Sequence, residues 1–295
     1  MVEPVLEVCV DNPAGLAAAL AGGADRIDMC AALGFGGLTP SAGLMALASK
    51  AQRRTGVPVY AMIRPRAGNF CYDDTEMAVM LADVAQARAA GLAGVVLGAG
   101  LADGGLDVGR LAGLVAAACG IGLTLHRVFD LVPDFGAALE QAVALGFRRV
   151  LTSGGTATAV QGLAELARLQ VQAAGRLVIM PGAGIDADAV AVLRRRLCLR
   201  EVHASCSEVM DATAAGRPGG GPGIMPGGGW DADAADVMGR GPELREMQAS
   251  CSMAAAGMAA AVLRLGFAPL RGPPDQCGSG GAAESGASRY RDRLT

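Results

Sequence analysis

Apolar and polar positions along the chain repeat in a regular order, in which short apolar runs alternate with longer segments rich in Ala and Leu. The longer segments, such as 74–90 and 158–174, have the period of an amphipathic helix, and the short runs are typical of buried strands. Many of the helical segments end in a glycine just before the next apolar run, as at Gly91 and Gly146. We expect strands at residues 5–10, 25–30, 58–64, 94–98, 121–126, 148–152, 177–181 and 200–204.

Eight strand–helix units in series predict an all-parallel sheet, and eight is also the number of strands that closes into a TIM (β/α)8 barrel. An open, doubly wound α/β sheet is the alternative. It is less favoured, because the segment after the first strand, Asp11-Asn-Pro-Ala-Gly15, lacks the glycine-rich fingerprint of a dinucleotide-binding fold. We therefore expect no nucleotide cofactor.

The repeating pattern ends near residue 206. Residues 216–229 contain 11 Gly or Pro in 14 positions, which excludes regular structure there. Residues 243–266 have the composition of a last helix, and residues 271–295 have that of a disordered tail. We expect a barrel over 1–206 and an atypical region over 207–295 that contributes little to a functional site.

Composition excludes several classes of function. No apolar run approaches the roughly 20 residues that cross a bilayer, and no signal-peptide pattern opens the chain, so a cytoplasmic protein without a membrane partner is expected. A net charge of −3 and 3% aromatic residues argue against a nucleic-acid partner. The eight cysteines form no C-x-x-C pair, so reduced thiols are expected rather than a zinc knuckle or a redox dithiol.

The first two strands carry the most informative chemistry. Each ends near a cysteine that has a carboxylate two residues before it, and side chains alternate along a strand. Glu7 and Cys9 therefore share one face, as do Asp28 and Cys30, while Met29 points to the other. If the strands are parallel neighbours, two thiols and two acids converge on one spot, as in metal sites and active sites. The alternative is that the thiols are two small core residues.

Further polar residues lie at the ends of the later strands, where barrel enzymes place their sites. His126 is a candidate general acid or base, with Asp130 or Glu7 as the carboxylate that fixes its tautomer. The turns that contain Ser153, Gly154, Gly155, Gly182 and Gly184 either hold an anion at a helix N-terminus or are simply tight. Arg64 and Arg66 either clamp an anion or pair with Glu7 and Asp28. These candidates for substrate or anion binding are Arg64, Arg66, Ser153, Gly154, Gly155, Gly182, Gly184 and His203.

Several ordered segments of the chain resemble the CutC family of copper homeostasis proteins. They run in order over residues 5–206 and are Leu6-Glu-Val-Cys-Val-Asp11, Gly22-Gly-Ala-Asp-Arg-Ile27, Gly36-Gly-Leu-Thr-Pro40, Met62-Ile-Arg-Pro-Arg66, Leu125-His-Arg-Val-Phe-Asp130, Arg149-Val-Leu-Thr-Ser-Gly154, Met180-Pro-Gly-Ala-Gly184 and Val202-His-Ala-Ser205. The resemblance implies a cytoplasmic TIM barrel that self-associates as a dimer or tetramer. It also implies a role in copper tolerance through Cu(I) binding, with Cys9 and Cys30 as the candidate thiols.

Three functions are consistent with these residues. The first is a copper homeostasis protein in which Cys9 and Cys30 bind Cu(I), a metal that favours sulfur ligands. The alternative is a barrel enzyme of the lyase or isomerase type that acts on a small anionic or phosphorylated metabolite. In it, Glu7, Asp28, His126 and Asp130 would be the catalytic candidates. The third is a binding module that uses the same residues without turnover.

Overall fold

The computed structural model describes residues 4–206, so the expectations for residues 207–295, with the glycine- and proline-rich segment, the last helix and the tail, lie outside the described residues. The elements in chain order are β1 (Val5–Val10), α1 (Pro13–Ala21), β2 (Arg26–Met29), η1 (Leu33–Phe35), α2 (Ala42–Thr55), β3 (Val59–Ile63), α3 (Asp74–Ala89), β4 (Gly94–Leu97), α4 (Val108–Ala118), β5 (Gly122–Leu125), η2 (Arg127–Leu131), α5 (Phe135–Ala144), β6 (Arg149–Thr152), α6 (Leu163–Ala173), β7 (Val178–Pro181), α7 (Ala187–Leu193) and β8 (Glu201–Ala204).

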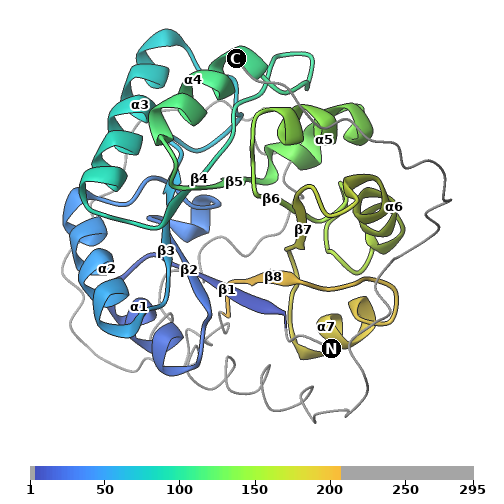
Figure 1. Cartoon of the computed structure of the whole chain (residues 1–295), viewed down its shortest axis with the longest axis horizontal. Helices are drawn as coiled ribbons and strands as arrows, with labels where there is room; N and C mark the ends of the chain where they lie inside the picture. Colours follow the sequence, from blue (N-terminus) through green and yellow to red (C-terminus); the bar gives the residue numbers. More distant parts are fainter. Residues whose placement is uncertain (1–3, 207–295) are drawn as a thin grey trace, which may run out of the picture.

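The strands form a TIM barrel, as the sequence predicts. Every strand pairing is parallel, and the strands follow one another in the order β7-β6-β5-β4-β3-β2-β1-β8. Figure 1 shows the strands as an inner ring with the helices outside it, viewed nearly along the axis of the barrel. β7 and β8 are in contact where the ring closes, although no strand pairing joins them within residues 4–206. The open, doubly wound sheet is therefore excluded.

The elements begin and end close to the positions that the pattern predicts. Each strand differs from its expected range by no more than one residue at either end. Six helices begin at an Asn, Ser or Asp whose side chain accepts a backbone N–H of the first turn, namely Asn12, Ser41, Asp73, Asp107, Asp134 and Asp186. α6 has no such cap and begins at Leu163, five residues later than the expected 158.

The two faces of the strands have different partners. Outward side chains such as Val8 and Val10 belong to the main apolar core, which lies beneath the helices. Inward side chains are largely polar or sulfur-bearing, and in β1 they are Glu7 and Cys9, both buried. The inside of the barrel is therefore where the chemistry of this chain is concentrated. No helix in residues 4–206 combines the length and apolar character needed to cross a membrane.

Candidate functional site

Glu7 is the centre of the polar interior. The strand register places it between Arg26 of β2 and His203 of β8, and its side chain is 0% exposed. Glu7 Oε1 lies 2.8 Å from His203 Nδ1, and Glu7 Oε2 forms an ion pair with Arg26 Nε. Burial acts to raise the pKa of Glu7, but the hydrogen bond from His203 and the charge of Arg26 outweigh it and lower the pKa to about 2. Glu7 is therefore an ionised, doubly paired carboxylate.

A wider ion-pair network extends this centre across the barrel. Glu201 pairs with both Arg26 and Arg149, and the guanidinium carbons of these arginines lie 5.6 and 5.0 Å from the ring centre of Tyr60. The sequence analysis missed Arg26, Arg149 and Glu201. Strand alternation could have found two of them, because Arg26 precedes Asp28 by two residues and Glu201 precedes His203 by two.

Asp28 lies beside this network, but its chemistry differs from that of Glu7. It is 1% exposed, and its Oδ1 has no hydrogen-bond partner within the described residues. Burial and the negative charge of Glu7 raise the pKa of Asp28 to about 7. The nearest ligand atoms of Glu7, Asp28 and His203 all lie within 4.8 Å of one another, so the two carboxylates and the imidazole converge as the sequence analysis expected for Glu7 and Asp28.

The two candidate thiols are also brought together. Cys9 lies opposite Asp28 in the register of β1 and β2, and Cys30 comes directly after β2. Both belong to one buried cluster inside the barrel, with Tyr60, Met62 and Val96. Burial, followed by the charges of Asp28 and Cys9, raises the pKa of the Cys30 thiol well above its usual range. A third thiol, Cys206, has its pKa raised to about 11 by burial and by the neighbouring Cys9.

His203 connects the thiols to the carboxylates. Burial acts to lower its pKa, but the electrostatic interactions and hydrogen bonds with Cys9 and Glu7 raise it well above its usual range. The imidazole is therefore held as a cation between an acid and a sulfur. Sequence analysis placed His203 among anion-binding residues, and the structure places it against Glu7 and Cys9 instead.

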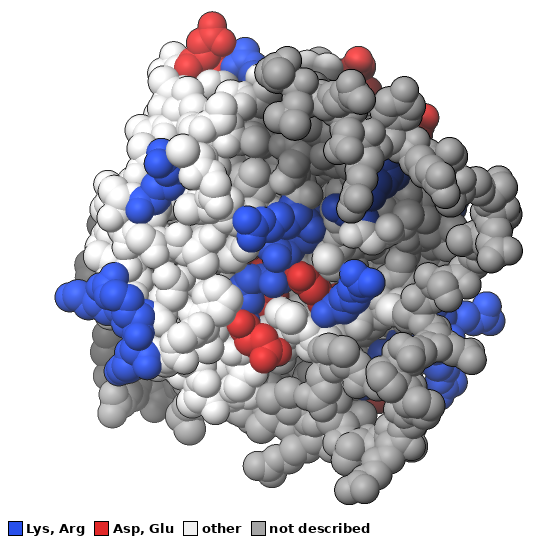
Figure 2. All heavy atoms as spheres, viewed as in Figure 1, with Lys and Arg blue, Asp and Glu red and all other residues white. Residues whose placement is uncertain are grey.

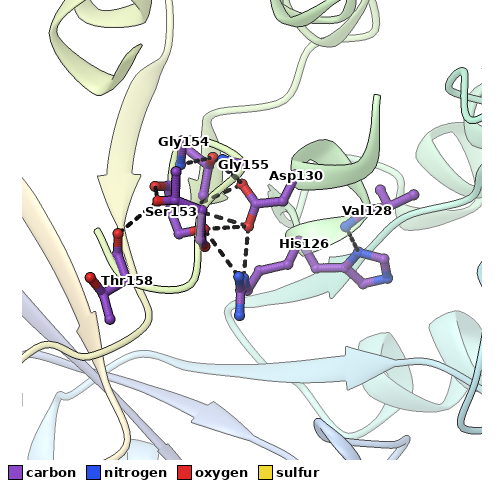
Figure 3. A network of polar contacts seen from close by, with 10 residues as sticks. His126, Val128, Asp130, Ser153, Gly154, Gly155 and Thr158 are labelled. Carbon is purple, nitrogen blue, oxygen red and sulfur yellow. Dashed lines mark hydrogen bonds and ion pairs between the residues drawn. The ribbon is translucent and has the colours of Figure 1, made fainter. Parts of the chain in front are cut away.

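His126 occupies a separate part of the interior and has no carboxylate partner in the described part of the chain. Its Nδ1 accepts the backbone N–H of Val128 at 3.1 Å, and its buried Nε2 has no partner within residues 4–206. Figure 3 shows the imidazole turned toward Val128 and away from the carboxylate of Asp130. Burial and the positive charge of Arg64 lower the pKa of His126 to about 3, so the ring is neutral. The expectation that Asp130 or Glu7 fixes the tautomer is wrong, because a backbone amide does so.

Asp130 instead holds the turn after β6. Its carboxylate accepts the backbone N–H groups of Ser153, at 3.0 and 3.2 Å, and of Gly155, at 3.2 Å, and it pairs with Arg127 at 2.7 Å (Figure 3). The N–H of Gly154 goes to Thr152 Oγ1 at 2.9 Å. These are the amides that the sequence analysis offered to an external anion. The anion at this turn is the protein's own carboxylate, so the expected site at Ser153–Gly155 is not available.

The turn after β7 also gives little support to an anion site. The N–H of Gly182 donates to the carbonyl of Thr152 at 3.1 Å, and α7, which follows, has only seven residues. Gly182 lies where an added Cβ would overlap Leu151, and Gly184 has a φ of +63°. The tight-turn alternative accounts for both glycines.

Neither arginine after β3 pairs with Glu7 or Asp28. The guanidinium of Arg64 donates to the carbonyls of Phe35, Gly37 and Gly68, and Arg66 forms an ion pair with Glu76. The alternative in which these arginines neutralise the two acids is therefore wrong, and Arg26 has that role for Glu7. Figure 2 shows that basic and acidic side chains lie next to one another near the middle of the face viewed.

The sequence relationships agree with this architecture. A family model described as the CutC family matches residues 4–208. The chain belongs to the CutC family. A CutC family protein of Rhizobium meliloti is 59% identical over 207 residues, which cover 70% of this chain and 83% of the relative. A CutC family protein of Caulobacter vibrioides is 54% identical over 201 residues, which cover 68% of this chain and 80% of the relative.

A solved CutC structure has the same fold. The candidate copper homeostasis protein CutC from Streptococcus agalactiae superposes with a TM-score of 0.66 at 29% identity, covering 69% of this chain and 99% of that one. A deoxyribose phosphate aldolase from Aeropyrum pernix is 14% identical, with a TM-score of 0.52, covering 68% of this chain and 85% of that one, and shows the barrel fold alone.

Proposed function

We propose that this CutC family chain is a copper homeostasis protein that binds Cu(I) inside its barrel through Cys9 and Cys30. The observation that carries the proposal is that both thiols are buried in one cluster between neighbouring strands. Cu(I) favours thiolate and thioether sulfur over oxygen ligands. Met62 adds a thioether to the same cluster, whereas Met29 lies in the apolar core outside the barrel.

The surroundings of the thiols determine how copper binding depends on pH. A thiol must lose its proton to become a metal ligand, and the pKa of Cys30 is raised well above its usual range by burial and by Asp28. The affinity for Cu(I) should therefore increase with pH, up to the pH at which Cys30 is already a thiolate in the copper-free protein.

The same proposal includes the cellular setting. None of the described cysteines forms a disulfide, and a reducing compartment such as the cytoplasm keeps cysteines as thiols. We also propose that the chain forms a homodimer or tetramer. Exposed apolar side chains such as Phe35 and Val171 support this, and sedimentation equilibrium would test it.

An anaerobic titration with Cu(I) against a competing chelator tests the copper site. The full-length chain is compared with a Cys9→Ser, Cys30→Ser double variant. The matched control is a Cys119→Ser, Cys198→Ser double variant, because these two residues are exposed and form no disulfide. Tight one-to-one binding that survives in the control and is lost in the Cys9, Cys30 variant is the expected result. Equal binding by all three chains, or weak binding by the unaltered one, would contradict the proposal and leave the two thiols as packing residues.

A second candidate function is an enzyme of the lyase or isomerase type that acts on a small anionic metabolite. The observation that favours it is the buried, neutral imidazole of His126, which has an unused ring nitrogen at the end of β5. Turnover of phosphorylated metabolites that disappears in a His126→Phe variant would support this function. The absence of turnover across such a panel, with folded protein, would contradict it.

A further inference from the structure

Arg64 is a buried cation that no carboxylate neutralises within residues 4–206. Its side chain is 3% exposed, and its guanidinium contacts three carbonyl oxygens, at 3.0 Å from Phe35, 3.3 Å from Gly37 and 3.0 Å from Gly68. Its Nε–H has no acceptor among the residues that the structure describes. Charged side chains are rarely buried without a partner of opposite charge, because removing them from water is costly. The three carbonyls hold the guanidinium in place and leave its charge uncompensated.

His126 presents a second unused donor. Because its Nδ1 accepts the N–H of Val128, the proton of the neutral ring is on Nε2. That nitrogen is fully buried, and no acceptor within residues 4–206 contacts it. A buried donor without a partner costs free energy, so it is expected to have an acceptor in the working protein.

The two donors belong to the same part of the barrel. Both groups pack on Phe70, with the guanidinium carbon of Arg64 4.8 Å and the ring centre of His126 4.7 Å from the centre of its ring. The strand between them, β4, is followed by Gly98, and an added Cβ there would overlap the imidazole. The missing side chain at Gly98 thus leaves the space that the imidazole of His126 occupies.

We propose that the barrel end formed by β3, β4 and β5 binds a small oxyanion, the carboxylate or phosphate group of a metabolite, which accepts hydrogen bonds from Arg64 Nε and His126 Nε2. This inference does not depend on copper binding, because it uses neither thiol. A guanidinium supplies the charge that attracts the anion. A neutral imidazole supplies a donor that can stabilise negative charge on oxygen without itself removing a proton.

Other parts of the barrel end do not offer the same combination. The amides after β6 already bind Asp130, and Arg66 is neutralised by Glu76. The charge of Glu7 is held between Arg26 of β2 and His203 of β8. The oxyanion is therefore expected on the β3–β5 side alone.

Nitrogen-15 NMR of the histidine rings tests this proposal directly. The chain contains two histidines, so a histidine-labelled sample of the full-length protein gives two imidazole signals, which a His203→Asn variant assigns. Inorganic phosphate and acetate are the probes, each titrated at constant pH and ionic strength to about 10 mM, well above the roughly 1 mM dissociation constant of a weak site. The expected result is a saturable shift of His126 Nε2 with either probe, and a much smaller shift of His203.

Two variants separate a specific site from a general effect of charge. His126→Phe removes the donor but keeps a ring on Phe70, and probe binding, measured by calorimetry, should weaken at least about tenfold. Arg168→Gln removes an exposed arginine paired with Glu165 and should leave binding unchanged. No saturable shift with either probe would overturn the proposal, as would equal weakening in both variants. Loss of copper binding would leave this result unaffected, so the two proposals fail independently.

Discussion

Replacing Glu7 by Gln should destabilise the barrel more than the loss of any single exposed ion pair would. The substitution keeps the shape of the side chain and removes the negative charge between Arg26 and His203. The pKa of Glu7 is lowered from 4.5 to about 2 by these partners, and each pKa unit corresponds to about 1.4 kcal/mol. The charged form is thus favoured by about 3 kcal/mol, in line with the roughly 3–5 kcal/mol lost when one partner of a buried pair is removed.

Urea denaturation followed by circular dichroism measures this loss at pH 7. The control is Glu165→Gln, which breaks an exposed pair with Arg168 and should cost less than about 1 kcal/mol. A carboxylate with a lowered pKa contributes stability above its unfolded value of about 4.5, and that stability is lost as the pH falls toward 2. The difference between Glu7→Gln and the unaltered chain should therefore disappear over the same range. A Glu7→Gln loss no larger than that of the control would refute the reasoning.

Three further substitutions test other parts of the interior. Asp28→Asn should raise the free energy of unfolding at pH 8 by at least about 1 kcal/mol, because the folded protein raises the pKa of Asp28 to about 7 and therefore opposes its ionisation. Below about pH 3.8 the carboxyl is neutral in both states, so urea denaturation should show no gain there. Gly122→Ala should lower the free energy of unfolding by about 1–3 kcal/mol or prevent folding, since its Cβ would overlap Tyr60. Gly113→Ala, at an exposed position of α4, should instead stabilise the protein by about 1 kcal/mol. Asp130→Asn should cost about 1–3 kcal/mol and speed hydrogen exchange of the amides at 153 and 155, and unchanged exchange would contradict the assigned contacts.

The order of the elements could be predicted from the sequence because each level of the pattern agrees. Helices begin at capping side chains such as Asp73 and Asp134, and the strands lie within one residue of their expected ends. The pairing of β1 with β2 then follows, and with it the convergence of Cys9 and Cys30. Short-range signals were sufficient for this much of the site.

The remaining contacts depend on distances across the barrel, which no local pattern contains. A glycine-rich turn looks the same whether its amides bind a ligand or Asp130, so the sequence left both possibilities open at Ser153. Arg26 and Arg149 are the first residues of their strands, whereas functional side chains of a barrel are expected at the strand ends, so the pattern did not point to them. Gly98 has no side chain from which chemistry could be predicted, yet this missing side chain leaves the space that His126 occupies.

The ion pairs inside the barrel also bear on how the chain folds. Glu201 is separated by 175 residues from Arg26 and by 52 from Arg149, and it lies in the last strand. Until that strand emerges from the ribosome and docks, Arg149 lacks its carboxylate partner and Arg26 has only Glu7. Burying either arginine before then would carry a desolvation cost without full compensation, and contacts of such long sequence separation form slowly. We therefore expect the docking of β8, which closes the barrel, to be a late step of folding. Without β8, the first seven strands should not form a fully paired interior.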